Sequence, residues 1–227
     1  AARADGIIIS PINSERVRKA IDRAVDSGIP VVATNADIDG TKRTCCVGIN
    51  NRKAARIAGR LMGQFLGGTG KIAVVSSAIA SENNNYYVQV RETEFADFIH
   101  KEYPDIEIIT TLDSFEDPQI TYEKTVKLLR DYQDLQGIYI TCGGVSQVGR
   151  ALEESGRAKD IRVISFEDYP EVVDLIRKDV IDCTLAGELQ QQGEIPVQII
   201  MDYLVFGKEP EQQQIFTDIR VLVKESL

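Results

Sequence analysis

The plan of the chain is set by the segment Ala4-Asp-Gly-Ile-Ile-Ile-Ser-Pro-Ile-Asn-Ser-Glu-Arg-Val-Arg-Lys-Ala-Ile-Asp-Arg-Ala-Val-Asp-Ser-Gly-Ile-Pro-Val-Val-Ala-Thr-Asn-Ala-Asp37. Its apolar run at residues 6–9 has no polar alternation, which is typical of a strand buried on both faces of a parallel sheet. Apolar residues at helical spacing follow between Asn13 and Val25, and Gly28 is the residue expected just past a helix end. The run at residues 29–33 then begins another buried strand, so the segment predicts one strand–helix–strand unit.

The same alternation continues to the end of the chain. Further strands are predicted at residues 44–49, 72–75, 106–111, 137–141, 162–166, 180–186 and 218–223. Helices are predicted at residues 52–65, 88–103, 118–132, 145–155, 171–178 and 193–206. Strands that alternate with helices in this way predict a doubly wound α/β architecture.

Composition limits the classes of function. The chain has 227 residues, a formal net charge of -9 and no Trp. Nucleic-acid affinity depends on clustered Lys and Arg, so any DNA binding by the protein is expected to come from another part of it. No apolar run approaches the length of a membrane span, and residues 1–5 contain no apolar signal core.

The four cysteines, Cys45, Cys46, Cys142 and Cys183, contain no C-x-x-C pair. Cys45 and Cys46 are adjacent in a predicted strand, where their side chains point to opposite faces and cannot form one metal claw. We favour free buried thiols over a disulfide, which fits a reducing compartment and favours the cytoplasm.

Two glycine-rich segments invite a nucleotide-binding interpretation. Residues 67–71 follow a helix, and a P-loop would need a glycine where Phe65 stands, so we interpret this segment as a helix stop. Residues 142–149 lie between a strand and a helix, and Glu167 ends the next strand, as in a dinucleotide site. The glycine spacing is not G-x-G-x-x-G, so nucleotide binding stays a minor alternative.

The sequence contains little that indicates a catalytic site. The only histidine, His100, lies on a predicted helix between Ile99 and Lys101 and is expected at the surface. No G-x-S-x-G motif supplies a nucleophile. We therefore predict a protein that is not an enzyme and that has no cofactor and no metal.

Polar residues at predicted strand ends form the candidate site, together with Arg91 at a helix start and Tyr86 nearby, because ligands of open α/β sheets bind beyond the carboxyl ends of the strands. Amides, a carboxylate and an arginine fork suit neighbouring sugar hydroxyls, and an aromatic face can cover the C–H side of a pyranose. The candidate ligand-binding residues are Ser10, Asn35, Asn51, Ser76, Tyr86, Arg91, Cys142 and Glu167.

Five segments carry a resemblance to a known superfamily: Ala4-Asp-Gly-Ile-Ile-Ile-Ser-Pro11, Ser27-Gly-Ile-Pro-Val-Val32, Val47-Gly-Ile-Asn-Asn51, Arg91-Glu-Thr-Glu-Phe95 and Ile161-Arg-Val-Ile-Ser-Phe-Glu167. In order and spacing the chain resembles the ligand-binding core of type I periplasmic sugar-binding proteins and of the lactose-repressor (LacI) family. The resemblance covers essentially the whole chain and is specific to the superfamily rather than to one sugar.

The resemblance implies two Rossmann-like lobes with a small ligand closing the cleft between them. The first lobe would hold residues 1–49 and 187–212, and the second lobe residues 50–186 and 213–227. Cores of this kind open with a strand, a helix and another strand before the Ala4-Asp-Gly segment, so the first lobe is expected to lack its opening strands here.

The resemblance also assigns roles to single residues. It places the cleft arginine at Arg91, the acidic residue after the late strand at Glu167, and the asparagine of the first crossover at Asn51. Sugar-binding relatives often carry Asp-Arg where this chain has Asn35-Ala36, and Asn-Asp where it has Cys142-Gly143, so the resemblance does not name the sugar.

On this basis we predict the effector-binding domain of a LacI-type transcriptional regulator. Such a domain is a cytoplasmic homodimer that senses a sugar or sugar-like ligand and binds operator DNA through a helix-turn-helix headpiece outside this chain. The alternative is a monomeric periplasmic sugar-binding receptor of an ABC transporter. A nucleotide-dependent enzyme that uses Gly143, Gly144 and Glu167 is the third interpretation.

Overall fold

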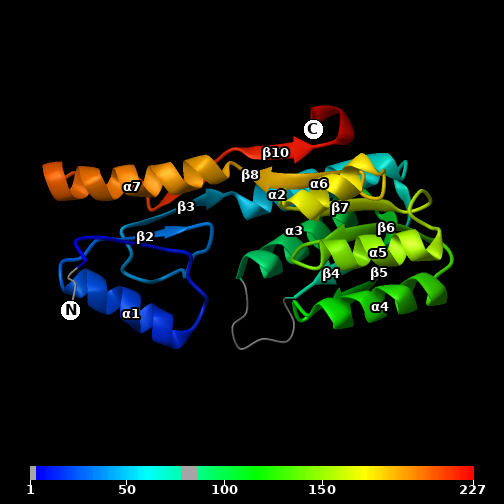
Figure 1. Cartoon of the computed structure of the whole chain (residues 1–227), viewed down its shortest axis with the longest axis horizontal. Helices are drawn as coiled ribbons and strands as arrows, with labels where there is room; N and C mark the ends of the chain where they lie inside the picture. The colour runs from blue at the N-terminus through cyan, green and yellow to red at the C-terminus, as the bar shows by residue number, and fades with distance from the viewer. Residues whose placement is uncertain (1–3, 78–85) are drawn as a thin grey trace. The chain divides into compact units, whose positions relative to one another are not determined.

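The structure is a computed structural model that describes residues 4–77 and 86–227. This part of the chain forms seven α-helices and ten strands that alternate along most of the sequence (Figure 1). The chain divides into two compact units: unit 1 contains Ala1–Asn50 and Gly187–Ile219, and unit 2 contains Asn51–Ala186 and Arg220–Leu227. The predicted α/β class is therefore confirmed.

Unit 1 is a four-stranded parallel sheet with the order β1-β2-β3-β9. Its strands are β1 (Ile7–Ile9), β2 (Val31–Thr34), β3 (Cys45–Ile49) and β9 (Gln214–Thr217). Helix α1 (Glu15–Asp26) covers one face, where it packs on Val31, and helix α7 (Leu189–Phe206) covers the other, where Ile200 packs on Val32. Strand β2 shows no polar alternation because its adjacent valines, Val31 and Val32, pack on opposite faces of the sheet.

The ends of α1 follow from its sequence. The Ser14 hydroxyl accepts a hydrogen bond from Val17 N at 3.3 Å, which satisfies one of the free N–H groups at the helix start. Gly28 follows the helix end with φ of 80°, a left-handed conformation that residues with a Cβ rarely adopt. The strand–helix–strand unit predicted from residues 4–37 is confirmed.

Unit 2 is a six-stranded sheet with the order β10-β8-β7-β6-β4-β5. Its strands in chain order are β4 (Thr69–Ser76), β5 (Asp105–Asp113), β6 (Leu135–Ile140), β7 (Arg162–Phe166), β8 (Cys183–Gly187) and β10 (Ile219–Leu222). The five strands from β4 to β8 pair in parallel. Their carboxyl ends therefore lie at one edge of the sheet.

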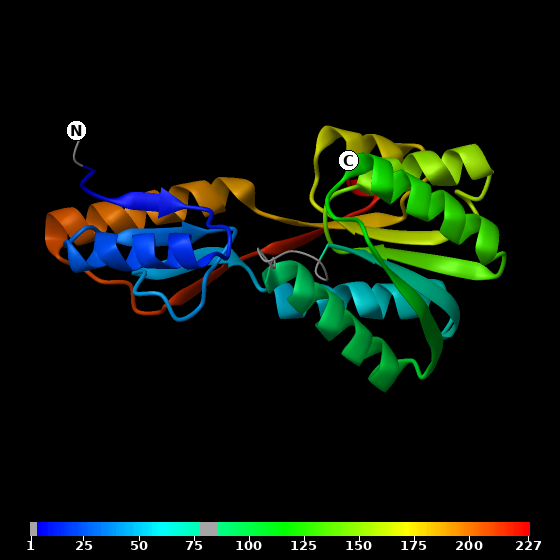
Figure 2. The same cartoon turned by 90° about the horizontal axis from the view of Figure 1, so that it is seen from below.

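Five helices cover the two faces of this sheet. Helices α4 (Pro118–Asp131), α5 (Val145–Ser155) and α6 (Pro170–Arg177) share one extensive core cluster. Helices α2 (Asn51–Phe65) and α3 (Tyr86–Glu102) pack together on the opposite face (Figure 2). Their close approach depends on Gly63, where a Cβ would lie 2.2 Å from the Tyr103 ring. A short 3₁₀ helix, Lys224–Ser226, follows β10.

The C-terminal segment corrects the sequence prediction. We predicted a single last strand at residues 218–223 and placed residues 213–227 in the second lobe. The structure has two strands instead: β9 pairs with β3 in unit 1, and β10 belongs to the sheet of unit 2. Only Asp218 separates the two strands, and β9 lies entirely before the predicted strand, so the sequence prediction missed it and with it the point where the chain leaves one sheet for the other.

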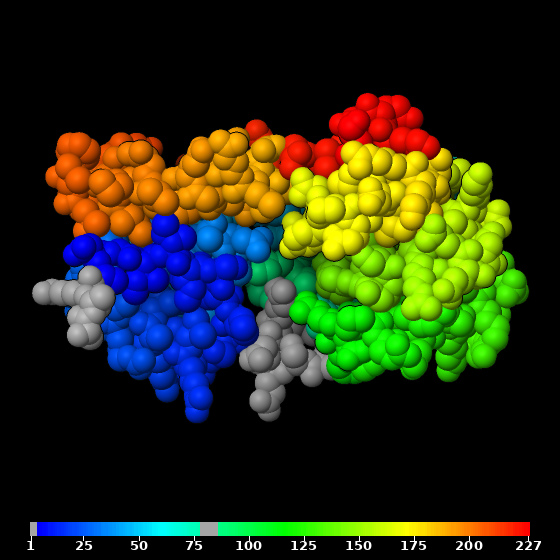
Figure 3. All heavy atoms as spheres, viewed as in Figure 1, coloured from blue at the N-terminus to red at the C-terminus, as the bar shows by residue number. Residues whose placement is uncertain are grey.

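Helix α7 has an unusually apolar outer face. Its buried side packs on the strands of unit 1, yet Val197, Met201, Val205 and Phe206 are exposed, with Phe206 at 76%. The space-filling view shows this helix, in orange, at the surface of unit 1 (Figure 3). It begins at Leu189, four residues before the predicted start, and therefore has Pro196 in its interior.

The described residues contain neither a membrane-spanning helix nor a cluster of metal ligands. None of their helices combines the length and the apolar character that crossing a bilayer requires. In the same residues, no group of three or more His, Cys, Asp or Glu side chains is arranged to hold a metal ion. His100 is exposed, as predicted, and all four cysteines are buried and free.

Candidate functional site

The predicted site residues divide between the two units. Ser10 and Asn35 belong to unit 1, and the other six residues belong to unit 2. Within unit 2 the structure brings four of them together: Arg91, Cys142 and Glu167 line one pocket, and Asn51 contacts Arg91. This pocket is the candidate functional site.

The pocket lies where β6 and β7 end and helices α5 and α6 begin, which is the edge at which α/β sheets bind ligands. Its volume is about 550 Å³, within the range of small-molecule sites. The lining residues are Val88, Arg91, Glu116, Cys142, Gly143, Gly144, Val145, Ser146, Phe166, Glu167, Tyr169, Glu171 and Val172.

Arg91 is fixed at the floor of this pocket. It projects from α3, is only 7% exposed, and its guanidinium lies over the Phe166 ring with 3.8 Å between Cζ and the ring centroid. Its Nε donates to Asn51 Oδ1 at 2.7 Å, and its Nη1 donates to the carbonyl oxygen of Thr141 at 3.1 Å. Burial lowers the pKa of Arg91 and the charge of Glu167 raises it, but an arginine stays protonated in proteins.

One side of the guanidinium remains available to a ligand. In the described part of the chain, Nη2 makes an ion pair of 3.7 Å with Glu167 Oε1, which is too long for a hydrogen bond. The two N–H groups of Nη2 and the oxygens of the Glu167 carboxylate therefore lie next to each other as hydrogen-bond donors and acceptors for a ligand. A buried cation with unused donors is costly unless a ligand or water satisfies them.

The backbone of Glu167 is held in an unusual conformation. Its φ is 71°, a left-handed value that residues other than glycine rarely adopt. Its N–H donates to Leu185 O at 2.8 Å, and its carbonyl accepts from Thr184 Oγ1 at 2.7 Å. Strand β8 thus holds Glu167 in place, which is the pattern expected when local strain serves a site.

Cys142 and the residues after it form another part of the wall. Cys142 is 8% exposed, and its Sγ lies 3.4 Å from Ser114 Oγ and 3.3 Å from Gly143 O. Burial raises the pKa of this thiol, so it is neutral at ordinary pH. Gly144 has φ of 92° and begins helix α5 without a side-chain cap.

Sequence reasoning missed Glu116. Its carboxylate accepts a hydrogen bond from Ser77 Oγ at 3.2 Å and lines the pocket. Strand β5 runs to Asp113, two residues further than predicted, and Phe115 and Glu116 follow it with φ of 51° and 54°. Had β5 been extended to Asp113, the rule of looking just beyond strand ends would have included Glu116.

Besides Asn51, which contacts Arg91 without lining the pocket, four predicted residues are not part of the pocket wall. Ser76 is fully buried at the end of β4, where its carbonyl accepts from Ser114 N at 2.7 Å. Tyr86 begins α3, is exposed, and makes an edge-to-face contact with a ring centroid distance of 6.4 Å to Tyr87. In unit 1, Ser10 and Asn35 are both exposed.

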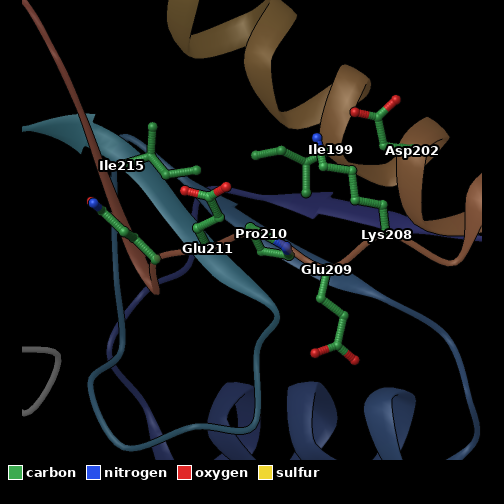
Figure 4. Close-up of a pocket in the computed structure, with 8 residues that line it drawn as sticks. Ile199, Asp202, Lys208, Glu209, Pro210, Glu211 and Ile215 are labelled. Atoms are coloured by element: carbon green, nitrogen blue, oxygen red, sulfur yellow. The ribbon is translucent and has the colours of Figure 1, made fainter.

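Unit 1 has a separate hollow near the amino end of strand β9. About 350 Å³ in volume, it lies between the end of α7 and the start of β9. It is lined by Ile199, Asp202, Lys208, Glu209, Pro210, Glu211, Gln212 and Ile215. Figure 4 shows that the carboxylates of Asp202 and Glu209 point away from each other, so these acidic side chains do not converge on one point.

The sequence matches a family model described as a periplasmic binding protein domain over residues 1–209. Among the solved structures that are similar to this chain, three are described at 25–28% identity. One, the sugar-binding protein of a sugar ABC transporter from Bacillus halodurans, is 28% identical with a TM-score of 0.86, and the match covers 97% of this chain and 78% of that one. AraP, an arabinose-binding protein from Geobacillus stearothermophilus, is 28% identical with a TM-score of 0.84, covering 97% and 77%.

The third is a solute-binding protein of an ABC transporter from Burkholderia graminis, in complex with D-arabinose. It is 25% identical with a TM-score of 0.85, and the match covers 97% of this chain and 76% of that one. The family model spans well over half of the chain, and the two lobes have the architecture of type I periplasmic binding proteins. The chain therefore belongs to the periplasmic binding protein domain family.

Proposed function

We propose that this chain binds a sugar or a similar polyhydroxylated molecule, without chemical change, in the unit 2 pocket around Arg91. The observation that carries the proposal is the pairing of Nη2 of Arg91 with the Glu167 carboxylate, 3.7 Å apart inside the pocket. Each sugar hydroxyl is both a donor and an acceptor. Two vicinal hydroxyls can therefore accept from the arginine and donate to the carboxylate at once.

The similar structures support this choice of ligand class. The Bacillus halodurans protein is described as sugar-binding, and both AraP and the Burkholderia graminis protein are associated with arabinose. Their identity to this chain is 25–28%, so they support a sugar as the class of ligand rather than one particular sugar.

For the role of the protein, we favour a sugar-binding receptor of an ABC transporter over a transcriptional regulator. Two of the similar structures are described as ABC transporter components. This reverses the order in which the sequence placed the two roles. A receptor works as a monomer that delivers its ligand to a membrane permease.

The LacI-type regulator remains the other candidate because of the thiols. Cys45, Cys46, Cys142 and Cys183 are all free and buried, which fits a reducing compartment such as the cytoplasm. This role needs a homodimer and a separate headpiece that contacts operator DNA. Native mass spectrometry of the full-length protein and its location after cell fractionation separate the two roles. A dimer in the cytoplasm indicates the regulator. A monomer in the periplasmic or membrane fraction indicates the receptor.

Sugar binding itself is tested by calorimetry and thermal shift against pentoses, hexoses, nucleosides and nicotinamide cofactors. A ligand at a hundred times its Kd stabilises the folded state by about 2.7 kcal/mol. Arg91→Ala removes charged hydrogen bonds worth about 1.5–3 kcal/mol each, so we expect sugar affinity to fall roughly 10-fold to 100-fold.

The matched control is Arg130→Ala, which removes an exposed arginine whose ion pair with Asp131 lies on α4. This variant is expected to bind sugars like the wild type. Equal affinity of the Arg91→Ala and wild-type proteins would contradict the assignment of the site. Stabilisation by nucleotides alone would favour the nucleotide-dependent enzyme.

A further inference from the structure

Carboxylates outnumber cations among the side chains that line the unit 2 pocket. Glu116, Glu167 and Glu171 each bring a carboxylate to the wall, whereas Arg91 is the only cationic side chain that lines it in the described part of the chain. The pocket does not depend on these acids, because it is a cavity of about 550 Å³ built around Arg91, which is 7% exposed. With three carboxylates and one guanidinium, the wall has an excess of two negative charges.

The carboxylates come from both sides of the pocket. The sheet order places β6 between β7 on one side and β4 and β5 on the other. Glu116 follows β5, Glu167 follows β7, and Glu171 lies in the first turn of α6, so they flank the segment that leads from β6 into α5. The Glu167 side chain is 30% exposed, and Glu116 and Glu171 are exposed. A ligand that occupies the pocket therefore has carboxylates on either side of it.

Most of these carboxylate oxygens are available to a ligand. Glu116 accepts one hydrogen bond, from Ser77 Oγ at 3.2 Å, and Glu167 has the ion pair of 3.7 Å with Arg91. The side chain of Glu171 has neither a hydrogen bond nor an ion pair with any other described residue. The wall therefore offers more negatively charged acceptors than the protein itself uses.

Positive charge near the pocket does not cancel this excess. Helices α5 and α6 begin at the wall, and each helix start is equivalent to about half a positive charge. Cations on neighbouring segments are already engaged: Lys124 Nζ donates to Asp113 O at 2.6 Å, and Arg220 pairs with Asp168 at 2.7 Å. After the two helix starts are counted, about one negative charge is left for a ligand to neutralise.

We propose that the unit 2 pocket prefers an amino sugar, whose ammonium group donates to the carboxylates of the wall while its hydroxyls meet Arg91 and the uncapped N–H groups at the start of α5. This inference rests on the proposed sugar binding and specifies the ligand class of the same site. An ammonium group has three donors and no acceptor, so it suits a wall with surplus acceptors. The ring of Tyr169, which also lines the pocket, adds a face that attracts cations.

The test compares two series of sugars that differ only at one nitrogen or oxygen: D-glucose, D-glucosamine and N-acetyl-D-glucosamine, and the three corresponding galactose derivatives. Kd values are measured by calorimetry on the full chain at low salt. In the series that binds more tightly, we expect the amino sugar to bind about 10-fold tighter than the neutral sugar, the scale of one charge-assisted hydrogen bond. The N-acetyl sugar keeps the nitrogen but not the charge, and it is expected to show no such gain.

A double variant, Glu116→Gln/Glu171→Gln, traces the preference to the wall. It keeps the shape of two exposed side chains and removes their charges, so the ratio of the Kd values of the neutral and amino sugars is expected to fall from about 10 toward 1. The matched control is Glu153→Gln, an exposed residue of α5 that does not line the pocket, and its ratio should equal that of the wild type.

Salt provides a measurement that needs no variant. Exposed carboxylates are screened by salt, so raising it from about 0.02 M to about 0.5 M should reduce the ratio several-fold while the Kd of the neutral sugar changes little. A ratio that changes neither with salt nor in the double variant would exclude the carboxylates as its origin.

Two other results would overturn the inference. An amino sugar that binds no tighter than its neutral counterpart, or no tighter than its N-acetyl form, excludes a preference for charge, although sugar binding itself would then stand. Binding of none of the six sugars, in a sample that unfolds cooperatively, would overturn the proposed function and the preference with it.

Discussion

The buried ion pair of unit 1 gives a quantitative prediction about stability. Asp37 and Arg43 are 8% and 6% exposed, and both Nε and Nη2 of the arginine donate to the carboxylate. Gln214 of β9 donates a further hydrogen bond to Asp37 Oδ2 at 2.6 Å, so the pair also joins the loop after β2 to the last strand of the sheet. Neither charge has access to water if its partner is removed.

Arg43→Met leaves the Asp37 carboxylate buried with only the amide of Gln214. Breaking a buried pair on one side typically costs about 3–5 kcal/mol, which for a chain of this size lowers the Tm by roughly 6–20 °C. The assay is thermal and urea unfolding followed by far-ultraviolet circular dichroism, because the chain has no Trp for fluorescence. The double variant Asp37→Leu/Arg43→Met removes both charges and is expected to recover most of the loss.

The control is the exposed pair Asp174 and Arg177 on α6, 3.3 Å apart. Surface pairs contribute about 0–1 kcal/mol, so Asp174→Asn should leave the Tm nearly unchanged. If Arg43→Met loses less than about 1 kcal/mol, or the double variant is no more stable than the single one, the carboxylate reaches water and the reasoning from burial fails.

Three further predictions follow from packing, ionisation and charge. Gly63→Ala places a Cβ 2.2 Å from the Tyr103 ring and should destabilise unit 2 by about 1–3 kcal/mol. The control Gly193→Ala adds a Cβ that meets no atom within 4 Å and should raise the Tm slightly. Equal Tm values for the two variants would argue against close packing of α2 and α3. Burial raises the pKa of Cys183 from 9.0 to about 12, so the neutral thiol contributes stability below pH 9 that is lost as the pH rises toward 12. The free energy of unfolding should fall by about 1 kcal/mol between pH 7 and pH 10 for this reason. Urea titrations at the two pH values should show a smaller fall for Cys183→Ala than for the wild type. Sugar acids should bind more weakly than the neutral sugars because carboxylates line the pocket. In calorimetry, Glu116→Gln should reduce the difference in Kd between a sugar acid and the neutral sugar.

Much of the fold could be predicted from the sequence because buried parallel strands and amphipathic helices have different apolar periods. The strand at residues 6–9, the helix after Ser14 and the strand that ends at Thr34 all follow from local pattern and capping chemistry. The pattern failed at Asp218, where two strands of different sheets follow each other. The short strands of residues 214–222 mix apolar and polar residues, and their pattern gives no sign that β9 and β10 have different neighbours.

The candidate site was predictable to a similar extent. Cys142 and Glu167 line the pocket because the rule about strand ends selects the right edge of the sheet, whereas Arg91, on helix α3, was predicted from its place near a helix start and from the resemblance. Ser76 satisfied the same rule but is fully buried and does not line the pocket, since position at a strand end does not tell which way a side chain points. Glu116 was missed because the predicted strand ended at residue 111, two residues before β5 ends at Asp113.

The pairing of β9 with β3 constrains the order in which the protein can fold during synthesis. Strand β3 ends at Ile49 and β9 begins at Gln214, so the ribosome must produce most of unit 2 before the sheet of unit 1 can be completed. Unit 2 needs only the short β10 to finish its own sheet and can collapse first. Helix α1 can cover one face of β2 early, but the face formed by Val32, Cys45 and Val47 stays uncovered until α7 emerges, so the nascent first unit is the segment that chaperones and proteases meet.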